Sequence, residues 1–257
     1  MRRDESSLAL AVAKLERQRI PLLEALRAVM LNPSLGHYGR AEAARLLAMD
    51  GSSIAVQALL ELFFAQNEKS ALRTTALTIE GLNDRRAIPQ LIHALQEDTN
   101  PHRKHAAARA LGWIRPSDRS TALALARCLV DTTQPQPARQ EAAESLAYVG
   151  TRETINPLIS ALADPDTRIR FWAVFGLGGT CCGDPRAVRA LESLLDDEAT
   201  PPGNWWSIGK EALAMLAKQP FYLDKLTNET QRILANPDAP PEDRNWAEFY
   251  DRSPPVD

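Results

Sequence analysis

Aromatic side chains that interrupt a polar pattern are the residues best suited to recognition chemistry in this chain. Several helical segments open with Arg or Lys and usually carry small or polar residues one, two and five positions later. The segment RFWAVFGLG, opened by Arg170, has large rings at all three positions. Exposed aromatic residues beside an arginine are typical interface anchors, although a terminal cap folded over them would make them ordinary core. The candidate partner-binding residues are Phe171, Trp172, Phe175, Trp205, Trp206, Trp113 and Tyr148.

A basic stretch at residues 102–119 contains Asp118 as its single acid. It predicts either a stripe of cations for an acidic partner or a nucleic-acid backbone, or a solvated helix face, which we favour. The formal net charge of −3 at pH 7 argues against a general affinity for nucleic acid or anionic membranes. The candidate basic stripe consists of Arg103, Lys104, Arg109 and Arg115.

The basic residues that open the helical segments recur in register along the chain. We expect them to form a structural ladder in which each bonds to carbonyls or acids of the adjacent repeat, in preference to contacting a ligand. An isolated exposed ion pair would add little stability, so the ladder matters only where it is buried and hydrogen-bonded. The expected ladder consists of Arg40, Arg73, Lys104, Arg139 and Arg170.

Residues suited to metal binding or covalent catalysis are sparse. Cys181 and Cys182 are adjacent and could bind a soft metal or form a strained disulfide. No nearby Cys or His pair would complete a tetrahedral site, so a small-residue turn is favoured. Cys128 occupies a position held elsewhere by alanine and is expected to be packed. The histidines lie at no diagnostic spacing and no nucleotide-binding loop occurs, so we expect no catalytic residue, metal or cofactor.

The elements that must position these residues follow a repeat. Six nine-residue segments share one apolar template, and their second positions are separated by 33, 33, 34, 33 and 33 residues. Apolar or small residues recur in each at i, i+3, i+4 and i+7, which is one face of an α-helix. A fixed period of this length indicates a repeat array. The segments are 21–29, 54–62, 87–95, 121–129, 154–162 and 187–195.

A second helix, opened by a basic or neutral residue and rich in small residues, is expected after each first one. Alanine has the best helix propensity and lets neighbouring helices approach closely. The expected second helices lie within 40–51, 73–82, 104–114, 139–150, 170–179 and 207–218. An Asn or Asp beside a proline is typical of a helix start, so helices are expected to begin at Asn100-Pro101, Asp164-Pro165 and Asp184-Pro185. Left-handed helix ends are expected at Gly81, Gly112, Gly150 and Gly178.

Together these patterns predict an all-α fold, a right-handed and curved α-solenoid of about six helix pairs with extra helices at both ends. A seventh template would begin near Phe221, but Asp224 and Lys225 occupy its apolar positions. Residues 221–234 and 241–252 therefore predict a divergent cap. The expected organisation is a capping helix at 1–20, the repeat array at 21–218, and a C-terminal cap and tail at 219–257.

The segments INPLISALADPDTRIRFWAVFGLG (155–178) and AIPQLIHALQED (87–98) resemble HEAT-like repeats of the phycobilisome-lyase type. The resemblance implies that first helices lie on a convex side and second helices on a concave side. Deoxyhypusine hydroxylases of similar architecture bind iron through His-Glu dipeptides, and this chain contains none. Bilin lyases, which usually act as paired subunits, are a second implied activity, but no residue here is diagnostic for it.

The function expected from the residues and the resemblance is a non-catalytic scaffold or regulatory adaptor that binds a protein or peptide on the concave face. The alternatives are an enzyme or enzyme subunit of the bilin-lyase type and a nucleic-acid-binding repeat protein. No secretory signal and no apolar run of about 20 residues is present, and three cysteines lack framework spacing. We therefore expect a cytoplasmic protein that has no contact with membranes.

Overall fold

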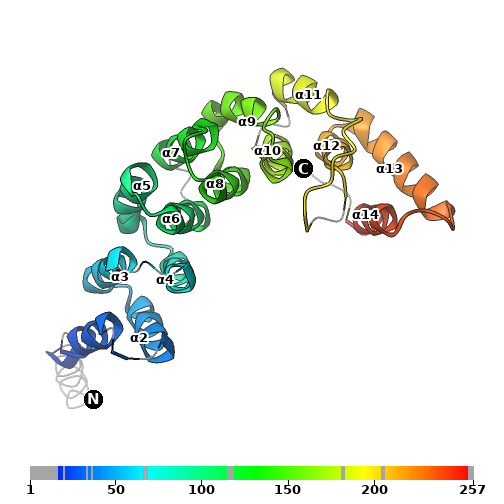
Figure 1. Ribbon diagram of the computed structural model, residues 1–257. Helices are drawn as coiled ribbons and strands as arrows, with labels where there is room; N and C mark the ends of the chain where they lie inside the picture. The colour runs from blue at the N-terminus through cyan, green and yellow to red at the C-terminus, as the bar shows by residue number, and fades with distance from the viewer. Residues whose placement is uncertain are drawn as a thin grey trace, which may run out of the picture. The chain divides into compact units, whose positions relative to one another are not determined.

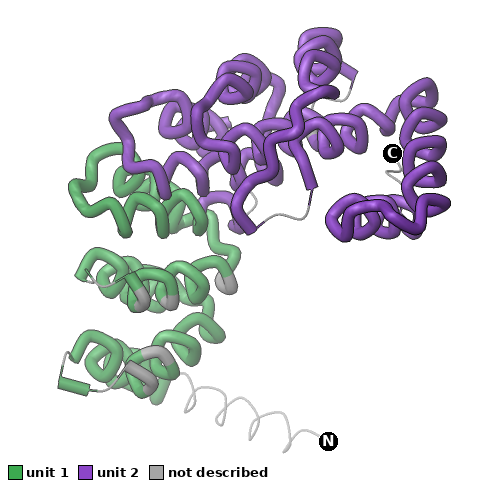
Figure 2. Tube along the Cα trace, turned by 45° about the vertical axis from the view of Figure 1, so that its right-hand side comes forward, with its two compact units in different colours: residues 1–110 green, residues 111–257 purple. Residues whose placement is uncertain are grey.

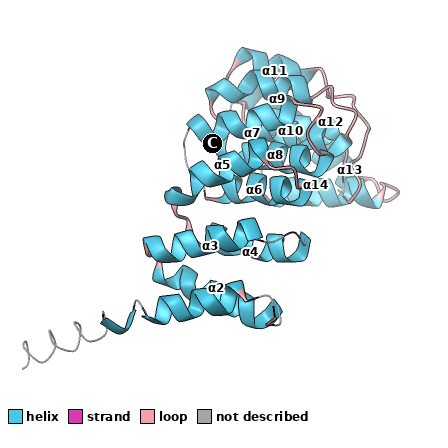
Figure 3. Cartoon of the chain, turned by 60° about the vertical axis from the view of Figure 1, so that its left-hand side comes forward, coloured by secondary structure: helices cyan, strands magenta, loops and turns pink. Residues whose placement is uncertain are grey.

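The computed structural model consists of helices and connecting loops in its described part, without strands (Figure 3). It describes residues 17–253 except 20, 33, 36, 66, 68, 115–118, 181, 182, 204 and 205. Residues 21–31 are helical and precede the helices labelled in Figure 1. These are α2 His37–Asp50, α3 Ser53–Ala65, α4 Lys69–Leu82, α5 Ile88–Glu97, α6 Pro101–Trp113, α7 Arg119–Val130, α8 Gln136–Val149, α9 Ile155–Ala161, α10 Thr167–Thr180, α11 Pro185–Glu192, α12 Ile208–Leu216, α13 Pro220–Ala235 and α14 Pro241–Arg252.

The predicted helix pairs are confirmed. The six template segments fall on residues 21–31 and on α3, α5, α7, α9 and α11, and the expected second helices fall on the even-numbered helices α2 to α12. Helices α13 and α14 cover the two segments predicted for the C-terminal cap. The predicted N-terminal capping helix lies mostly outside the described residues. The chain is therefore an all-α solenoid of stacked helix pairs.

Side-chain caps explain where several helices begin. Asp184 accepts a hydrogen bond from the backbone N–H of Arg186, and Pro185 occupies the first turn of α11. Asn100 caps α6 in the same way by accepting from the N–H of His102 at 2.9 Å. Each cap satisfies one of the backbone donors that a helix start leaves without an intrahelical partner.

The prediction that glycines end the second helices in a left-handed conformation is wrong. Gly81, Gly112 and Gly178 lie inside helices, and Gly150 follows α8 with a φ of −57°. A Cβ atom built on Gly178 would lie 2.4 Å from the Cβ of Met215 in α12. Glycine is therefore needed at position 178 because it lets α10 and α12 pack closely, and not because the backbone adopts a left-handed conformation there.

By its contacts the chain forms two compact units, residues 1–110 and residues 111–257, with the division inside α6 (Figure 2). In the N-terminal unit α2, α3 and α4 pack against one another around buried Leu47, Leu59 and Phe63. The template repeats across residue 110 without a break, so the repeat pattern does not mark this division. The three-part organisation expected from the sequence stays a prediction.

The C-terminal unit has two layers of helices and a closing pair. First helices α7, α9 and α11 contact one another in sequence, and second helices α8, α10 and α12 form the other layer (Figure 1). Helix α14 packs against α13 and reaches α12 through an ion pair between Lys210 and Asp243. Trp246 of α14 is fully buried. We call the side formed by α8 and α10, together with the end of α6, the second-helix face.

Candidate partner-binding surface

Four aromatic rings from three successive second helices form a continuous row in the C-terminal unit. Trp113 ends α6 and its ring centroid lies 5.5 Å from that of Tyr148 in α8. Tyr148 lies 6.3 Å from Phe175 in α10, and Phe175 lies 5.7 Å from Trp172. These separations are typical of interacting aromatic pairs. We call Trp113, Tyr148, Phe175 and Trp172 the aromatic row.

Small residues beneath the row bring its helices together. A Cβ atom on Gly112 would lie 2.5 Å from the Cβ of Ser145, so only glycine allows α6 and α8 to approach this closely. A Cβ atom on Gly176 would lie 3.2 Å from a side-chain methyl group of Leu158 and 3.6 Å from the Cα of Ala147. The alanines and glycines of the second helices thus set the spacing at which the larger rings meet.

The row is accessible to water. Tyr148 is 42% exposed, and Trp113, Trp172 and Phe175 are half-buried. Exposed or half-buried positions in both helices follow the three- and four-residue steps of one helical face. They are residues 137, 140, 144 and 148 in α8 and residues 168, 172, 175 and 179 in α10. The rings therefore lie on the solvent-facing stripe of each helix, where polar residues are the rule.

Phe171 was predicted to be a partner-binding residue, but its side chain does not belong to the accessible surface. Its side chain is 6% exposed, and its ring meets Trp172 edge-on at 5.9 Å. One residue along a helix rotates a side chain by about 100°, so adjacent positions cannot both centre on the exposed stripe. Phe171 supports the Trp172 ring from the core side.

The described ring contacts of Trp206 are with the C-terminal cap and not with the aromatic row. Its ring lies 5.7 Å from Phe249 and 6.1 Å from Tyr250, both in α14. Its indole N–H donates a 2.7 Å hydrogen bond to the carboxylate of Glu211 in α12. Trp205 lies outside the described residues. We call Trp206, Trp246, Phe249 and Tyr250 the cap cluster.

Glu211 is buried inside the cap cluster. Tyr250 donates a second, longer hydrogen bond of 3.3 Å to the same carboxylate oxygen that Trp206 contacts. Burial raises the pKa of Glu211 to about 7, because the charged form loses water that two donors only partly replace. The pKa of the Tyr250 hydroxyl is raised by burial and by the neighbouring carboxylate.

The predicted basic stripe does not form an open row of cations. Arg103 makes an ion pair with Asp98 at 2.7 Å, and its side chain is largely covered. Lys104 is buried and donates to a backbone carbonyl at the end of α5. Arg109 lies 3.2 Å from a carboxylate of α4. The described members are thus used inside the fold, and Arg115 lies outside the described residues.

The expected ladder of basic residues forms at four of its five positions. Arg40, Lys104, Arg139 and Arg170 each donate to a backbone carbonyl near the end of a first helix, at 2.8 to 3.0 Å. The accepting carbonyl belongs to the same helix pair, whereas the prediction placed it in the adjacent repeat. These bonds satisfy carbonyls that a helix end leaves without partners. Arg73 is exposed and lies outside this arrangement.

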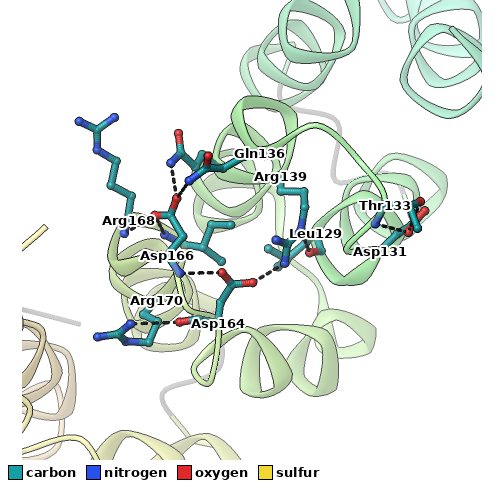
Figure 4. Close-up of polar contacts among 11 residues, drawn as sticks. Leu129, Asp131, Thr133, Gln136, Arg139, Asp164, Asp166, Arg168 and Arg170 are labelled. Atoms are coloured by element: carbon teal, nitrogen blue, oxygen red, sulfur yellow. Dashed lines mark hydrogen bonds and ion pairs between the residues drawn. The ribbon is translucent and has the colours of Figure 1, made fainter. Parts of the chain in front are cut away.

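Adjacent repeats are linked by carboxylates. Arg139 is buried and pairs with Asp164 in the next repeat while it donates to Leu129 (Figure 4). Arg170 repeats the arrangement, since it donates to the carbonyl of Asp164 and lies 3.6 Å from Asp197. The ladder therefore joins each of these helix pairs to the next one.

The prediction that Asp164-Pro165 starts a helix is wrong, because α10 begins at Thr167. Asp164 instead belongs to a set of aspartates that recur in register after the first helices, a set that was not predicted. Each accepts a hydrogen bond from the backbone N–H two residues later, at 2.8 to 3.0 Å, which fixes the turn after a first helix. Their spacing of 33 residues equals the repeat period and could have identified them from the sequence. The four residues are Asp98, Asp131, Asp164 and Asp197.

Sites for metals or membranes are not evident in the described residues. No group of three or more His, Cys, Asp or Glu side chains is placed to hold a metal ion in the described part of the chain. Cys128 is buried, and Cys181 and Cys182 lie outside that part. Among the described helices, none has both the length and the apolar composition needed to cross a membrane.

A family model for HEAT repeats matches residues 56–147 and 128–203. The chain belongs to the HEAT-repeat family. The two matches span α3 to α11 and the loop that follows, and therefore include the aromatic row. The predicted resemblance to HEAT-like repeats is confirmed.

Individual relatives are similar to part of this chain or share its fold. The phycocyanobilin lyase subunit alpha of Picosynechococcus sp. is 30% identical over 113 residues, which cover 42% of this chain and 41% of the relative. The solved complex of CpcE and CpcF of phycocyanin lyase from Nostoc sp. PCC7120 is 19% identical, with a TM-score of 0.53 and coverage of 90% of this chain and 94% of that chain. An archaeal HEAT-like repeat protein from Thermococcus onnurineus NA1 has the same TM-score at 15% identity, covering 88% and 94%. These two structures show the fold.

Proposed function

We propose that the chain is a non-catalytic scaffold or regulatory adaptor that binds a protein or peptide on its second-helix face. The aromatic row carries this proposal. Three helices place four large rings on their solvent-facing stripes, and one ring is 42% exposed. Aromatic rings that keep contact with water in the free protein bury much apolar area when a partner covers them.

The family supports an interaction role for this face. In a repeat array each unit packs against its neighbours, which leaves the two outer faces of the stack for other molecules. One of the similar solved structures is a complex of two proteins, CpcE and CpcF. The ladder bonds hold helix pairs together, whereas the rings of the row lie on helical stripes that are usually polar.

Capture from a lysate of the native host, followed by titration of the purified partner, tests the proposal. We expect the Trp172→Ala variant to bind about 10-fold or more weakly, as truncation of a central anchor usually does. Phe221→Ala is the matched control, because Phe221 is 64% exposed but lies on α13. Equal affinities of parent and Trp172→Ala protein for the captured partner would exclude the row as the interface.

A bilin-lyase-type subunit is the second candidate, favoured by the relative described as a phycocyanobilin lyase subunit alpha. A subunit of that type would be expected to recognise the linear tetrapyrrole or its acceptor protein. Addition of phycocyanobilin to the purified chain tests this reading through its visible absorbance. A saturable spectral change that Trp172→Ala abolishes would favour the lyase type, whereas an unchanged spectrum would favour the adaptor. Nucleic-acid binding has less support because the described residues of the basic stripe, Arg103, Lys104 and Arg109, are engaged within the fold.

A further inference from the structure

A carboxylate lies on the same stripe as the aromatic row. Gln140, Glu144 and Tyr148 follow one another in α8 at four-residue intervals, which places them on one helical face. Glu144 is half-buried. Tyr148 contacts both Trp113 and Phe175, so it is the middle ring of the row. The carboxylate of Glu144 is thus one helical turn from the centre of the row.

The unit that carries the row is acidic. Residues 111–257 contain 15 Lys and Arg against 21 Asp and Glu, a formal charge of −6, whereas residues 1–110 contain 15 against 12, a charge of +3. Three basic residues of α8 and α10 already have partners. Arg139 and Arg170 bond to carbonyls and carboxylates of the ladder, and Arg168 donates to the carbonyl of Pro202. Arg168 keeps its positive charge, because a backbone carbonyl does not neutralise a guanidinium. The acidic balance of the unit and the carboxylate of Glu144 therefore favour a cationic partner at the Tyr148 end of the row.

Aromatic faces and a carboxylate together favour an arginine side chain. The face of an aromatic ring attracts a cation, and a guanidinium also stacks flat on it and forms bidentate hydrogen bonds with a carboxylate. The cap of this chain contains the same kind of contact, since the ammonium of Lys225 lies 4.5 Å from the ring centroid of Phe221 and 5.2 Å from that of Tyr222.

The spacing of the row suits an extended chain. Alternate side chains of an extended peptide point the same way and are about 6.6 Å apart. The row centroids are separated by 5.5, 6.3 and 5.7 Å. Arginines at alternate positions could therefore lie over Trp113, Tyr148 and Phe175, which come from successive helices, whereas the step from Phe175 to Trp172 runs along α10.

We propose that the aromatic row and Glu144 bind an extended partner segment that has arginine at alternate positions. This inference rests on the proposed function, because it names the chemistry of the partner that the second-helix face would take. Guanidinium groups lie over the exposed rings, and one of them donates hydrogen bonds to the Glu144 carboxylate.

Titration with capped hexapeptides tests the chemistry directly. The probes alternate glycine with arginine, lysine or glutamate, and a fourth probe is hexaproline. Binding is followed by calorimetry at about 0.15 M salt, where long-range charge effects between exposed groups are largely screened. We expect the arginine peptide to bind at least about 3-fold more tightly than the lysine peptide, and the glutamate peptide to show no binding.

Substitutions in the aromatic row and at Glu144 test where the arginine peptide binds. We expect Trp172→Ala to weaken the arginine peptide about 10-fold and Glu144→Gln to weaken it about 3-fold. Phe221→Ala and Glu198→Gln are the matched controls, because they remove an exposed ring and an exposed charge of the same unit at other places. Circular dichroism and thermal unfolding establish that every variant keeps the parent fold.

The outcomes separate the two proposals. Preference for arginine that is lost in Trp172→Ala and kept in both controls supports the inference. Equal affinity for lysine and arginine, equal loss in Glu198→Gln and Glu144→Gln, or no binding of the arginine peptide overturns it. If hexaproline alone binds and Trp172→Ala abolishes that binding, the inference fails while the proposed function stands. The proposed function fails separately if the captured native partner binds parent and Trp172→Ala protein equally well.

Discussion

The aromatic row and the cap cluster use the same residue types within one unit, yet their environments differ. Trp246 of the cap cluster is fully buried and Trp206 bonds to a buried carboxylate, whereas Tyr148 of the row is 42% exposed. The difference arises because α14 turns Trp246 and Tyr250 toward α12, where they meet Lys210 and Glu211, whereas Tyr148 lies on the exposed stripe of α8. Phe249, on the outer side of α14, is the exception in the cap cluster, since it is 49% exposed. Covered rings stabilise the fold, while rings left on the stripe remain available for a partner.

Replacing one tryptophan from each cluster should separate these roles most clearly. We expect Trp246→Ala to lower the free energy of unfolding by about 4 kcal/mol, because it removes a fully buried ring and leaves a cavity. Trp172→Ala should cost about 1 kcal/mol, because Trp172 is half-buried at the surface. Chemical denaturation measures both. Equal losses would mean that the row is core and would remove the basis of the comparison.

The buried ladder residue Arg139, in the same helix as Tyr148, gives the next largest expected effect. Arg139→Ala should cost about 3 kcal/mol, because it leaves the buried carboxylate of Asp164 without its guanidinium partner. Arg73→Ala is the matched control at the exposed ladder position and should cost less than about 1 kcal/mol. Similar losses for the two variants, measured by urea denaturation, would show that ladder position and not burial sets the cost.

These contacts show what the sequence could and could not predict. The 33-residue period was sufficient for the helix pairs, because a shared core forces the same apolar face in each unit. The aspartates at the same spacing were equally visible, but Asp164 was interpreted as the cap of a helix beginning at Pro165, because an acid beside a proline is typical of a helix start. The burial of Phe171 beside Trp172 follows from helical periodicity and could have been predicted, whereas the contacts of Trp206 depend on where α14 packs. The local pattern does not contain that information.

The pH dependence of stability should distinguish the cap cluster from the aromatic row, because Glu211 titrates inside the cap cluster. Its pKa is about 7 in the folded protein against an ordinary value of 4.5, so between these pH values the folded state binds one more proton than the unfolded state. The contribution of this group is fully present below about pH 4.5 and decreases as pH rises to about 7, by roughly 2 to 3 kcal/mol.

Glu211→Gln should remove that slope while its amide oxygen still accepts the hydrogen bond of Trp206. The variant should therefore gain stability relative to the parent as pH rises from 5 to 8. Denaturation series at matched pH values give the difference directly, and groups titrating elsewhere cancel because both proteins share them. A difference that does not change with pH would mean that Glu211 is ionised in the folded cap.

The smallest effect on stability is expected at the centre of the row. Tyr148→Ala removes a ring that is 42% exposed, so the free energy of unfolding should fall by less than about 1 kcal/mol. The same change uncovers Trp113, whose ring centroid lies 5.5 Å away, and acrylamide quenching of tryptophan fluorescence should increase. Tyr148→Phe keeps the ring and should match the parent in both measurements. A row built for binding tolerates truncation in the free protein, because its rings contribute most of their buried area only when a partner covers them.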